Sequence, residues 1–488
     1  MWERSLGSNF VPTKGSALPT PIDPTSTAFL FAENRSQPMH VGGLQLFRKP
    51  EGAGRSFVKD LYDEMLTYQD PSPLFLKRPH RSLATAGQWF WVEDDSFDVE
   101  YHFRHSALPK PGRIRELLEL CGRLHSTRLA LERPLWEVHL IEGLRDGRVA
   151  MYTKLHHALV DGVSSMRLLQ SVLSTREDEL WMPPMWSARH RSRRAAADSP
   201  ATDAGPGVRD IPSSAFRTAL GISAEAAGLP VALAKTLKRG VRNETSAVSL
   251  YAPRTMFNTK ITGSRRFAAE DWELDRIKAV GKATGTTIND VVLAMCSGAV
   301  RSYLDELDAL PDASLVAMVP VGLQAKNSQS ASASGGNALG AVMCKLGTDL
   351  ADPADRLQSV HHSMQTGKEA LSSMTPTQIL AMSALGMAPA VLAPMLRLQG
   401  VTRPPFNLII SNVPGPRKPH YFNGARLEGV YPLSIPIHNV ALNITCTSYD
   451  DRLDFGLTGC RRTVPRLQRL LGHLDHELGA LEEAAGIA

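Results

Sequence analysis

Two adjacent histidines, His156 and His157, are followed by Asp161 and Gly162 in the sequence HHALVDG. A histidine side chain is mostly neutral at pH 7, because its ordinary pKa is roughly 6.5, so it can take a proton from a hydroxyl group. The aspartate can orient the imidazole or pair with an arginine to hold the turn, and the glycine permits backbone angles that a Cβ resists. The pattern HHxxxDG thus predicts a general base in a tight turn.

This motif lies where a strand is predicted to end and a helix to begin. Residues 148–155 contain β-branched and large side chains with no breaker, and Met166, Leu169 and Val172 recur at helical spacing. The end of a strand holds side chains on a rigid scaffold beside a cleft. A lone histidine pair is more often structural, but the complete motif at such a junction favours a catalytic site.

Local patterns predict several other elements. A short helix is expected over 22–33, capped by Asp23 or Thr25, and an amphipathic helix over 114–129. The alternation in 97–103 predicts a strand. The pair His361-His362 falls on a helical segment with no Asp-Gly after it, so we interpret it as structural.

Length and composition predict two globular domains. The 488 residues exceed the usual size of one core, and 43% of them are hydrophobic. The net charge of +5 is slight for this length and does not argue for nucleic acid as a partner. Five scattered cysteines without a CxxC pair suggest neither a zinc site nor a disulfide framework, which fits a reducing cytosol. No basic-then-apolar signal segment opens the sequence, so a cytoplasmic location is expected.

Four further segments accompany the histidine motif in a fixed order. They are PMHVGG at 38–43, PLW at 134–136, Asn-Asp at 289–290 and NVPGP at 412–416. With HHxxxDG, they make residues 25–480 resemble the bacterial wax ester synthase/diacylglycerol acyltransferase family. That family lies within the acyl-CoA-dependent acyltransferases related to chloramphenicol acetyltransferase and peptide-synthetase condensation domains. The chain departs from these relatives at Gln324, where they commonly carry an arginine.

The resemblance implies an α/β fold of two chloramphenicol-acetyltransferase-like domains. Each would have a mixed β-sheet flanked by helices, and an active-site tunnel would lie at their interface. The expected divisions are a flexible arm (1–22), an N-terminal acyltransferase domain with the motif (23–181), a linker (182–212) and a C-terminal acyltransferase domain (213–488). The linker is basic, then rich in Ala, Pro, Gly and Asp, and lacks apolar periodicity.

The resemblance also implies roles for the motif residues. His157, the second of the pair, would be the general base, and His156 would support it. Asp161 and Gly162 would maintain the turn rather than carry protons. Glu33 matches a glutamate on the short helix that opens the family's sequences, which makes it a candidate for substrate binding.

Three other residues, Asn289, Asp290 and Trp136, are candidates for substrate or oxyanion contacts. Asn289 would lie in the first turn of a helix over 288–307, where unpaired N–H groups and the helix dipole suit a thioester oxyanion. A plain capping role competes, because Thr287 and Asp290 have the spacing of a capping box. Trp136 either lines the cleft or packs in the core.

The implied reaction moves a fatty acyl group from acyl-CoA to the hydroxyl of a long-chain alcohol or of diacylglycerol. The products would be wax esters, triacylglycerol or both. No cofactor or metal is implied, acyl-CoA being a co-substrate, and the absence of a GxSxG motif fits direct transfer. The alternatives are a related acyltransferase for another lipid or polyketide alcohol, and a non-catalytic lipid-binding protein.

Two segments suggest peripheral association with the inner membrane face or with lipid droplets. The run 379–396 is apolar and uncharged, but Pro389 and Pro394 interrupt it, so a transmembrane anchor is the lesser alternative. The basic cluster in 189–194 can meet acidic phospholipid, although such runs are usually only solvated.

Overall fold

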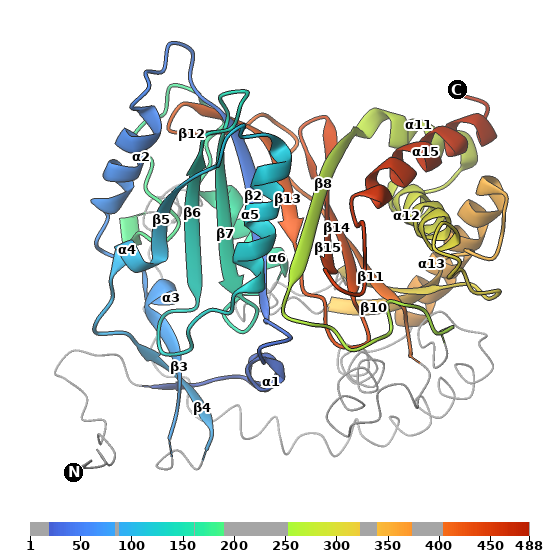
Figure 1. The fold of residues 1–488 in the computed structure, drawn as a ribbon, viewed down its shortest axis with the longest axis horizontal. Helices are drawn as coiled ribbons and strands as arrows, with labels where there is room; N and C mark the ends of the chain where they lie inside the picture. Colours follow the sequence, from blue (N-terminus) through green and yellow to red (C-terminus); the bar gives the residue numbers. More distant parts are fainter. Residues whose placement is uncertain are drawn as a thin grey trace, which may run out of the picture.

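The computed structural model describes residues 19–82, 87–160, 162–189, 252–322, 339–372 and 404–487. Two six-stranded sheets stand side by side, with helices on their flanks (Figure 1). Both sheets combine parallel and antiparallel pairs. The predicted α/β architecture with two mixed sheets is therefore confirmed, and we refer to the two halves as the N lobe and the C lobe.

The N lobe is built on the sheet that carries the histidine motif. Its strands, in spatial order, are β12 (Tyr421–Phe422), β13 (Ala425–Leu433), β2 (His40–Arg48), β7 (Val149–His156), β6 (Trp136–Glu142) and β5 (Phe103–Ala107). The N-lobe helices are α1 (Pro24–Ala32), α2 (Phe57–Leu66), α3 (Pro73–Leu76), α4 (Val99–His102), α5 (Ile114–Ser126) and α6 (Gly162–Ser171). A small separate sheet orders β1 (Thr20–Pro21), β4 (Trp89–Glu93) and β3 (Lys77–Arg81).

The C lobe has its helices on the face of its sheet that points away from the N lobe (Figure 1). Its strands, in spatial order, are β10 (Leu339–Lys345), β9 (Val316–Gly322), β11 (Leu408–Val413), β14 (Leu442–Tyr449), β15 (Arg452–Cys460) and β8 (Arg265–Glu273). The helices are α11 (Leu274–Thr284), α12 (Ile288–Asp305), α13 (Pro353–Ser372) and α15 (Arg469–Ala484). One large apolar core joins these helices to the outer face of the sheet.

A strand from the C-terminal half crosses into the N-lobe sheet. β13 pairs antiparallel with β2, although it lies far beyond the predicted division at residue 213. On its other side, Val430 N–H donates to the Asp454 carboxylate of β15 at 2.6 Å. A Cβ on Gly456 would lie only 1.8 Å from the Pro432 carbonyl oxygen, so the close approach of β15 to β13 requires glycine there. This crossing strand holds the two lobes together.

Several local predictions are confirmed, and one is wrong. Asp23 caps α1 by accepting from Ser26 N–H, and β7 leads into α6 as the motif pattern predicted. The strand predicted over 97–103 is instead the short helix α4 followed by β5. The reason is that Asp98 accepts from Glu100 N–H at 3.0 Å and starts a helical turn, which buries Val99 and His102 on one side.

Some predicted features lie outside the described residues. They are the arm over 1–18, most of the linker, Asp161, Gln324 and the apolar run 379–396. In the parts of the chain that the structure does describe, no helix combines the length and the apolar character needed to cross a membrane. The division into 23–181 and 213–488 stays a prediction, with the crossing strand as an addition to it.

Candidate active site

The histidine pair sits at the end of β7, held by both neighbouring strands. His156 N–H donates to the Leu135 carbonyl, next to β6, at 3.0 Å, and His157 N–H donates to the Met39 carbonyl, next to β2, at 2.9 Å. His40 on β2 stands directly opposite His156 in the antiparallel register. Backbone hydrogen bonds therefore fix the turn from two sides.

The imidazole of His157 lies flat against an aromatic ring. Its ring centroid is 4.1 Å from that of Phe29 on α1, and the two planes are 19° apart. His157 is half-buried, whereas His156 is fully buried. The helix that opens the N lobe thus sets the plane of the predicted base.

Glu33, just after α1, faces the first histidine. His156 Nδ1 accepts the Ala158 N–H at 3.0 Å, so the ring proton of neutral His156 belongs on Nε2. That nitrogen lies 3.6 Å from Oε1 of Glu33, whose side chain is 1% exposed. The same oxygen accepts the Met39 N–H at 3.2 Å. Glu33 therefore contacts both His156 and Met39, the residue before β2 whose carbonyl holds His157. This is a positioning role, which the position of Glu33 in the sequence did not indicate.

A buried ion pair lies two residues before His156. The side chain of Lys154 is 0% exposed, and its Nζ is 2.9 Å from the Glu137 carboxylate. It also donates to the carbonyls of Leu124 and Thr127, at 3.2 and 3.0 Å, where α5 ends. Burial opposes the ionisation of Glu137, but the His139 hydrogen bond and the Lys154 charge outweigh it and lower the pKa of Glu137 to about 2.

Neutral histidines extend this pair into a polar layer between the sheet and α5. Burial lowers the pKa of His125 to about 3 and that of His40 well below its usual value. His40 Nε2 donates to the His125 carbonyl at 3.0 Å, and His125 Nε2 donates to the Ser434 carbonyl, just after β13, at 3.0 Å. Tyr152 O–H donates to His125 Nδ1 at 2.8 Å.

This polar layer was missed from the sequence. Lys154, Glu137 and His139 interrupt strands that are otherwise apolar, and that interruption is the signal that could have found them. We use the name polar layer for His40, His125, Glu137, His139, Tyr152 and Lys154. It lies directly behind the motif turn and links it to the crossing strand.

The remaining N-lobe candidates divide between the site and the core. Gly162 is the first residue of α6. Trp136 is 0% exposed, and its indole N–H donates to the Phe75 carbonyl at 2.9 Å. Its ring stacks on Trp186 at 5.4 Å, so the structure places Trp136 in the core, the second of the two roles open to it.

Asn289 lies in the first turn of α12, a helix of the C lobe, as predicted from the sequence. Thr287 and Asp290 form the predicted capping box of α12, with both hydrogen bonds present. Asp290 also pairs with His361 of α13, from Oδ2 to Nδ1, at 2.8 Å. The C-lobe sheet stands between α12 and the N lobe, because the apolar side chains of α12 pack on the outer face of that sheet (Figure 1). These contacts assign Asp290 to the start of the helix.

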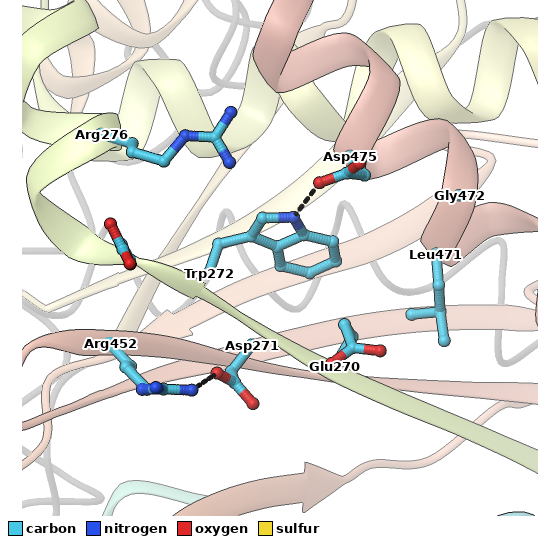
Figure 2. A pocket seen from close by; sticks show the side chains of 9 residues that line it. Glu270, Asp271, Trp272, Arg276, Arg452, Leu471, Gly472 and Asp475 are labelled. Carbon is cyan, nitrogen blue, oxygen red and sulfur yellow. Dashed lines mark hydrogen bonds and ion pairs between the residues drawn. The ribbon is translucent and has the colours of Figure 1, made fainter.

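Two surface hollows lie at the end of the lobes that is away from the histidine pair. The larger, of about 550 Å³, is shown in Figure 2, where Trp272 donates to Asp475 and Arg452 pairs with Asp271. The smaller, of about 380 Å³, includes Arg48 at the far end of β2. Since β2 rises about 3.3 Å per residue, Arg48 is roughly 26 Å from His40. We do not assign either hollow to the histidine site.

Comparisons with solved structures agree with this fold. A solved condensation domain of the CDA synthetase covers 96% of this chain at a TM-score of 0.56 and 17% identity, which shows the fold alone. The solved wax ester synthase/diacylglycerol acyltransferase from Marinobacter aquaeolei covers 96% of this chain, and all of its own length is matched, at a TM-score of 0.74 and 44% identity.

Matches to family models and to similar proteins identify the family to which the chain belongs. Residues 22–292 match the wax ester synthase/diacylglycerol acyltransferase catalytic domain, and 335–482 match the C-terminal domain of the same family. A putative diacylglycerol O-acyltransferase of Mycobacterium tuberculosis is 48% identical over 474 residues, which is 96% of this chain and 100% of that protein. A second from that species is 46% identical over 464 residues, 95% of this chain and 99% of that protein. The chain belongs to the wax ester synthase/diacylglycerol acyltransferase family and is an acyltransferase.

Proposed function

We propose that the protein transfers a fatty acyl group from acyl-CoA to the hydroxyl of a long-chain alcohol or of diacylglycerol, with His157 as the general base. The observation that carries this proposal is the turn after β7. It presents a half-buried imidazole, fixed by Phe29 and by backbone bonds, beside a carboxylate-oriented partner histidine.

The chemistry follows from that base. His157 takes the hydroxyl proton as the acceptor oxygen attacks the thioester carbonyl, and a tetrahedral oxyanion forms. The carbon–sulfur bond then breaks, and His157 returns its proton to the CoA thiolate, so the products are an ester and CoA. Asp161 and Gly162 are assigned to maintaining the turn. The oxyanion needs a hydrogen-bond donor, and we favour a backbone N–H over Asn289, because Asn289 lies on the C-lobe helix α12.

Both acceptors are supported by the relatives. The mycobacterial proteins are named for diacylglycerol, and the Marinobacter enzyme is named for wax esters as well. We extend both acceptors to this chain on the strength of 44–48% identity over nearly its whole length. Acyl-CoA is the proposed donor. Because such acceptors are hydrocarbon-rich, we also propose peripheral association with the inner membrane face or with lipid droplets.

The test is thiol release from palmitoyl-CoA by the purified protein with hexadecanol, with dipalmitoylglycerol and with neither. Acceptor-dependent release should fall by at least roughly 10²-fold in His157→Ala, the lower range for a general base. His476→Ala, at an exposed position of α15, is the control and should match the wild type. Circular dichroism checks folding. A folded His157→Ala variant with near-normal release would exclude the assignment, and no release from the wild type would favour a lipid-binding role.

A further inference from the structure

After the exposed Thr25 near its start, helix α1 is apolar on the side that faces solvent. Leu30 is 4% exposed and packs in the core, and Phe29 covers His157, as a buried face should. Phe31, however, is 62% exposed, and Ala28, three residues earlier, is also exposed. A surface helix of a water-soluble domain normally has a polar outer face, so this apolar face calls for a partner.

The small sheet next to α1 enlarges this apolar face and adds positive charge. The rings of Phe31 and Trp89 meet edge to face at 6.4 Å. The exposed guanidinium of Arg81 lies over both rings, at 5.9 Å from the Phe31 centroid and 5.4 Å from the Trp89 centroid. Arg81 makes no ion pair within the described part of the chain. It ends the strand β3, which reads KRPHR.

These groups lie at the end of the N lobe where the reaction takes place. Figure 1 shows α1, β3 and β4 together at the lower edge of the lobe, whereas β12 lies at its upper edge. Phe29, against His157, and Phe31, in solvent, are two residues apart on one short helix. Because residues two apart on an α-helix point to nearly opposite sides, a surface that held Phe31 would lie across α1 from the base, about one helix diameter (roughly 10 Å) away.

We propose that Phe31, Trp89 and Arg81 form a docking surface for an anionic lipid layer, through which the lipid acceptor reaches His157. Aromatic rings at the acyl boundary with an arginine directed to the headgroups are the arrangement that binds such a layer. A lipid layer fits better than a protein partner, because diacylglycerol and long-chain alcohols are stored in lipid and not in water. The route of the acceptor rests on the proposed function, whereas docking itself does not.

The experiment measures partitioning of the full chain onto vesicles by sedimentation. Mixed phosphatidylcholine–phosphatidylglycerol vesicles are compared with phosphatidylcholine alone. Phe31→Asp should lower the partition coefficient by roughly ten-fold or more, since it removes an inserted aromatic ring. Arg81→Glu should weaken binding only to the anionic vesicles, and salt should weaken wild-type binding in the same way.

The chain offers a matched control on the other side of the N lobe. Trp181 is 72% exposed, and neighbouring Leu180 lies by Pro50, just past the far end of β2. Trp181 has a φ of 58°, which asparagine adopts readily, so Trp181→Asn removes an exposed aromatic ring without backbone strain. This variant should partition as the wild type does. Equal loss in Trp181→Asn and Phe31→Asp, or undiminished binding of Phe31→Asp, would overturn the docking surface.

Activity separates this inference from the proposed function. For Phe31→Asp, the ratio of thiol release with vesicle-embedded dioleoylglycerol to release with dissolved hexanol should fall at least roughly ten-fold. An unchanged ratio overturns the acceptor route. If the wild type docks through Phe31 and Arg81 but releases no thiol with either acceptor, the proposed function fails and the docking surface stands.

Discussion

A buried ion pair lies in each lobe, and the two pairs are built alike. In the N lobe, Lys154 contacts Glu137 and donates to two backbone carbonyls at the end of α5. In the C lobe, Arg356 pairs with Glu477 and donates to two backbone carbonyls just before α13. All four side chains are less than a tenth exposed. Each cation thus ties a helix end to a carboxylate on another element.

The surroundings of the two pairs differ. Lys154 belongs to the polar layer, which continues to His40 opposite His156. Arg356 lies among helices whose core is otherwise apolar, and the Glu477 carboxylate occupies the space that a side chain on Gly298 would need. A buried ion pair alone is therefore no sign of chemistry. What marks the N-lobe pair is that it continues into the motif turn.

The strongest way to test this contrast is to break each pair. Lys154→Met and Arg356→Met each leave a buried carboxylate without its main partner, so each should lower the free energy of unfolding by about 3–5 kcal/mol. Among molecules that remain folded, only Lys154→Met should lower kcat for thiol release, because only Lys154 lies behind the motif turn. Urea unfolding and kcat measured in the folded range provide the two readouts.

A double replacement serves as the control for this prediction. Lys154→Met with Glu137→Leu removes both charges, and stability should recover in large part, since an apolar pair can replace a buried ion pair. If kcat stays low in the stable double variant, the polar layer positions the histidines. If kcat falls equally in Arg356→Met, the contrast between the lobes is wrong.

Acid should destabilise the protein through the polar layer. The pKa of His125 is about 3 in the folded state, against roughly 6.5 in an unfolded chain, so below pH 6.5 the unfolded state binds more protons. Stability is therefore lost as the pH falls through this window, by roughly 2 kcal/mol between pH 6.5 and 5 for His125 alone. His40, whose pKa is also lowered, acts in the same direction.

The measurement is urea unfolding at several pH values for the wild type and His125→Gln. The variant should be less stable at pH 7 but should lose less stability on acidification. His476→Gln, on the exposed side of α15, should keep the wild-type dependence on pH. A wild type whose stability does not change between pH 7 and 5 would contradict a buried, neutral His125.

The sequence was informative where structure depends on neighbours along the chain. The strand-to-helix junction after His156, the Asp23 cap and the Thr287–Asp290 capping box all follow from residues within a few positions of each other. The polar residues of β6 and β7 stand out in the sequence, but their union into one polar layer could not be derived in this way, because it depends on the register of β2, β6 and β7 together. Even the local error at α4 has this cause: the alternation in 97–103 does not tell which side chains the rest of the lobe will bury.

A replacement of Glu33 tests whether its carboxylate positions His156. Glu33→Gln retains an oxygen for the Met39 N–H but removes the charge that faces His156 Nε2. We expect kcat to fall roughly ten-fold with little change in KM, which corresponds to about 1.4 kcal/mol in transition-state stabilisation. Glu51→Gln, at an exposed position after β2, is the matched control. A change in KM alone would show that Glu33 contacts substrate instead of positioning the histidine.

The smallest effects are expected at the start of α12, for replacements of Thr287 and Asn289. Thr287→Ala removes the cap that accepts the Asp290 N–H at 3.2 Å and should cost about 1 kcal/mol of stability. Asn289→Ala, in the same helical turn, should leave kcat within a factor of about two, because we favour a backbone N–H as the oxyanion donor and α12 packs in the C-lobe core. A fall in kcat of roughly 10²-fold, typical of a lost oxyanion donor, would instead return Asn289 to the active site and require the lobes to rearrange during the reaction.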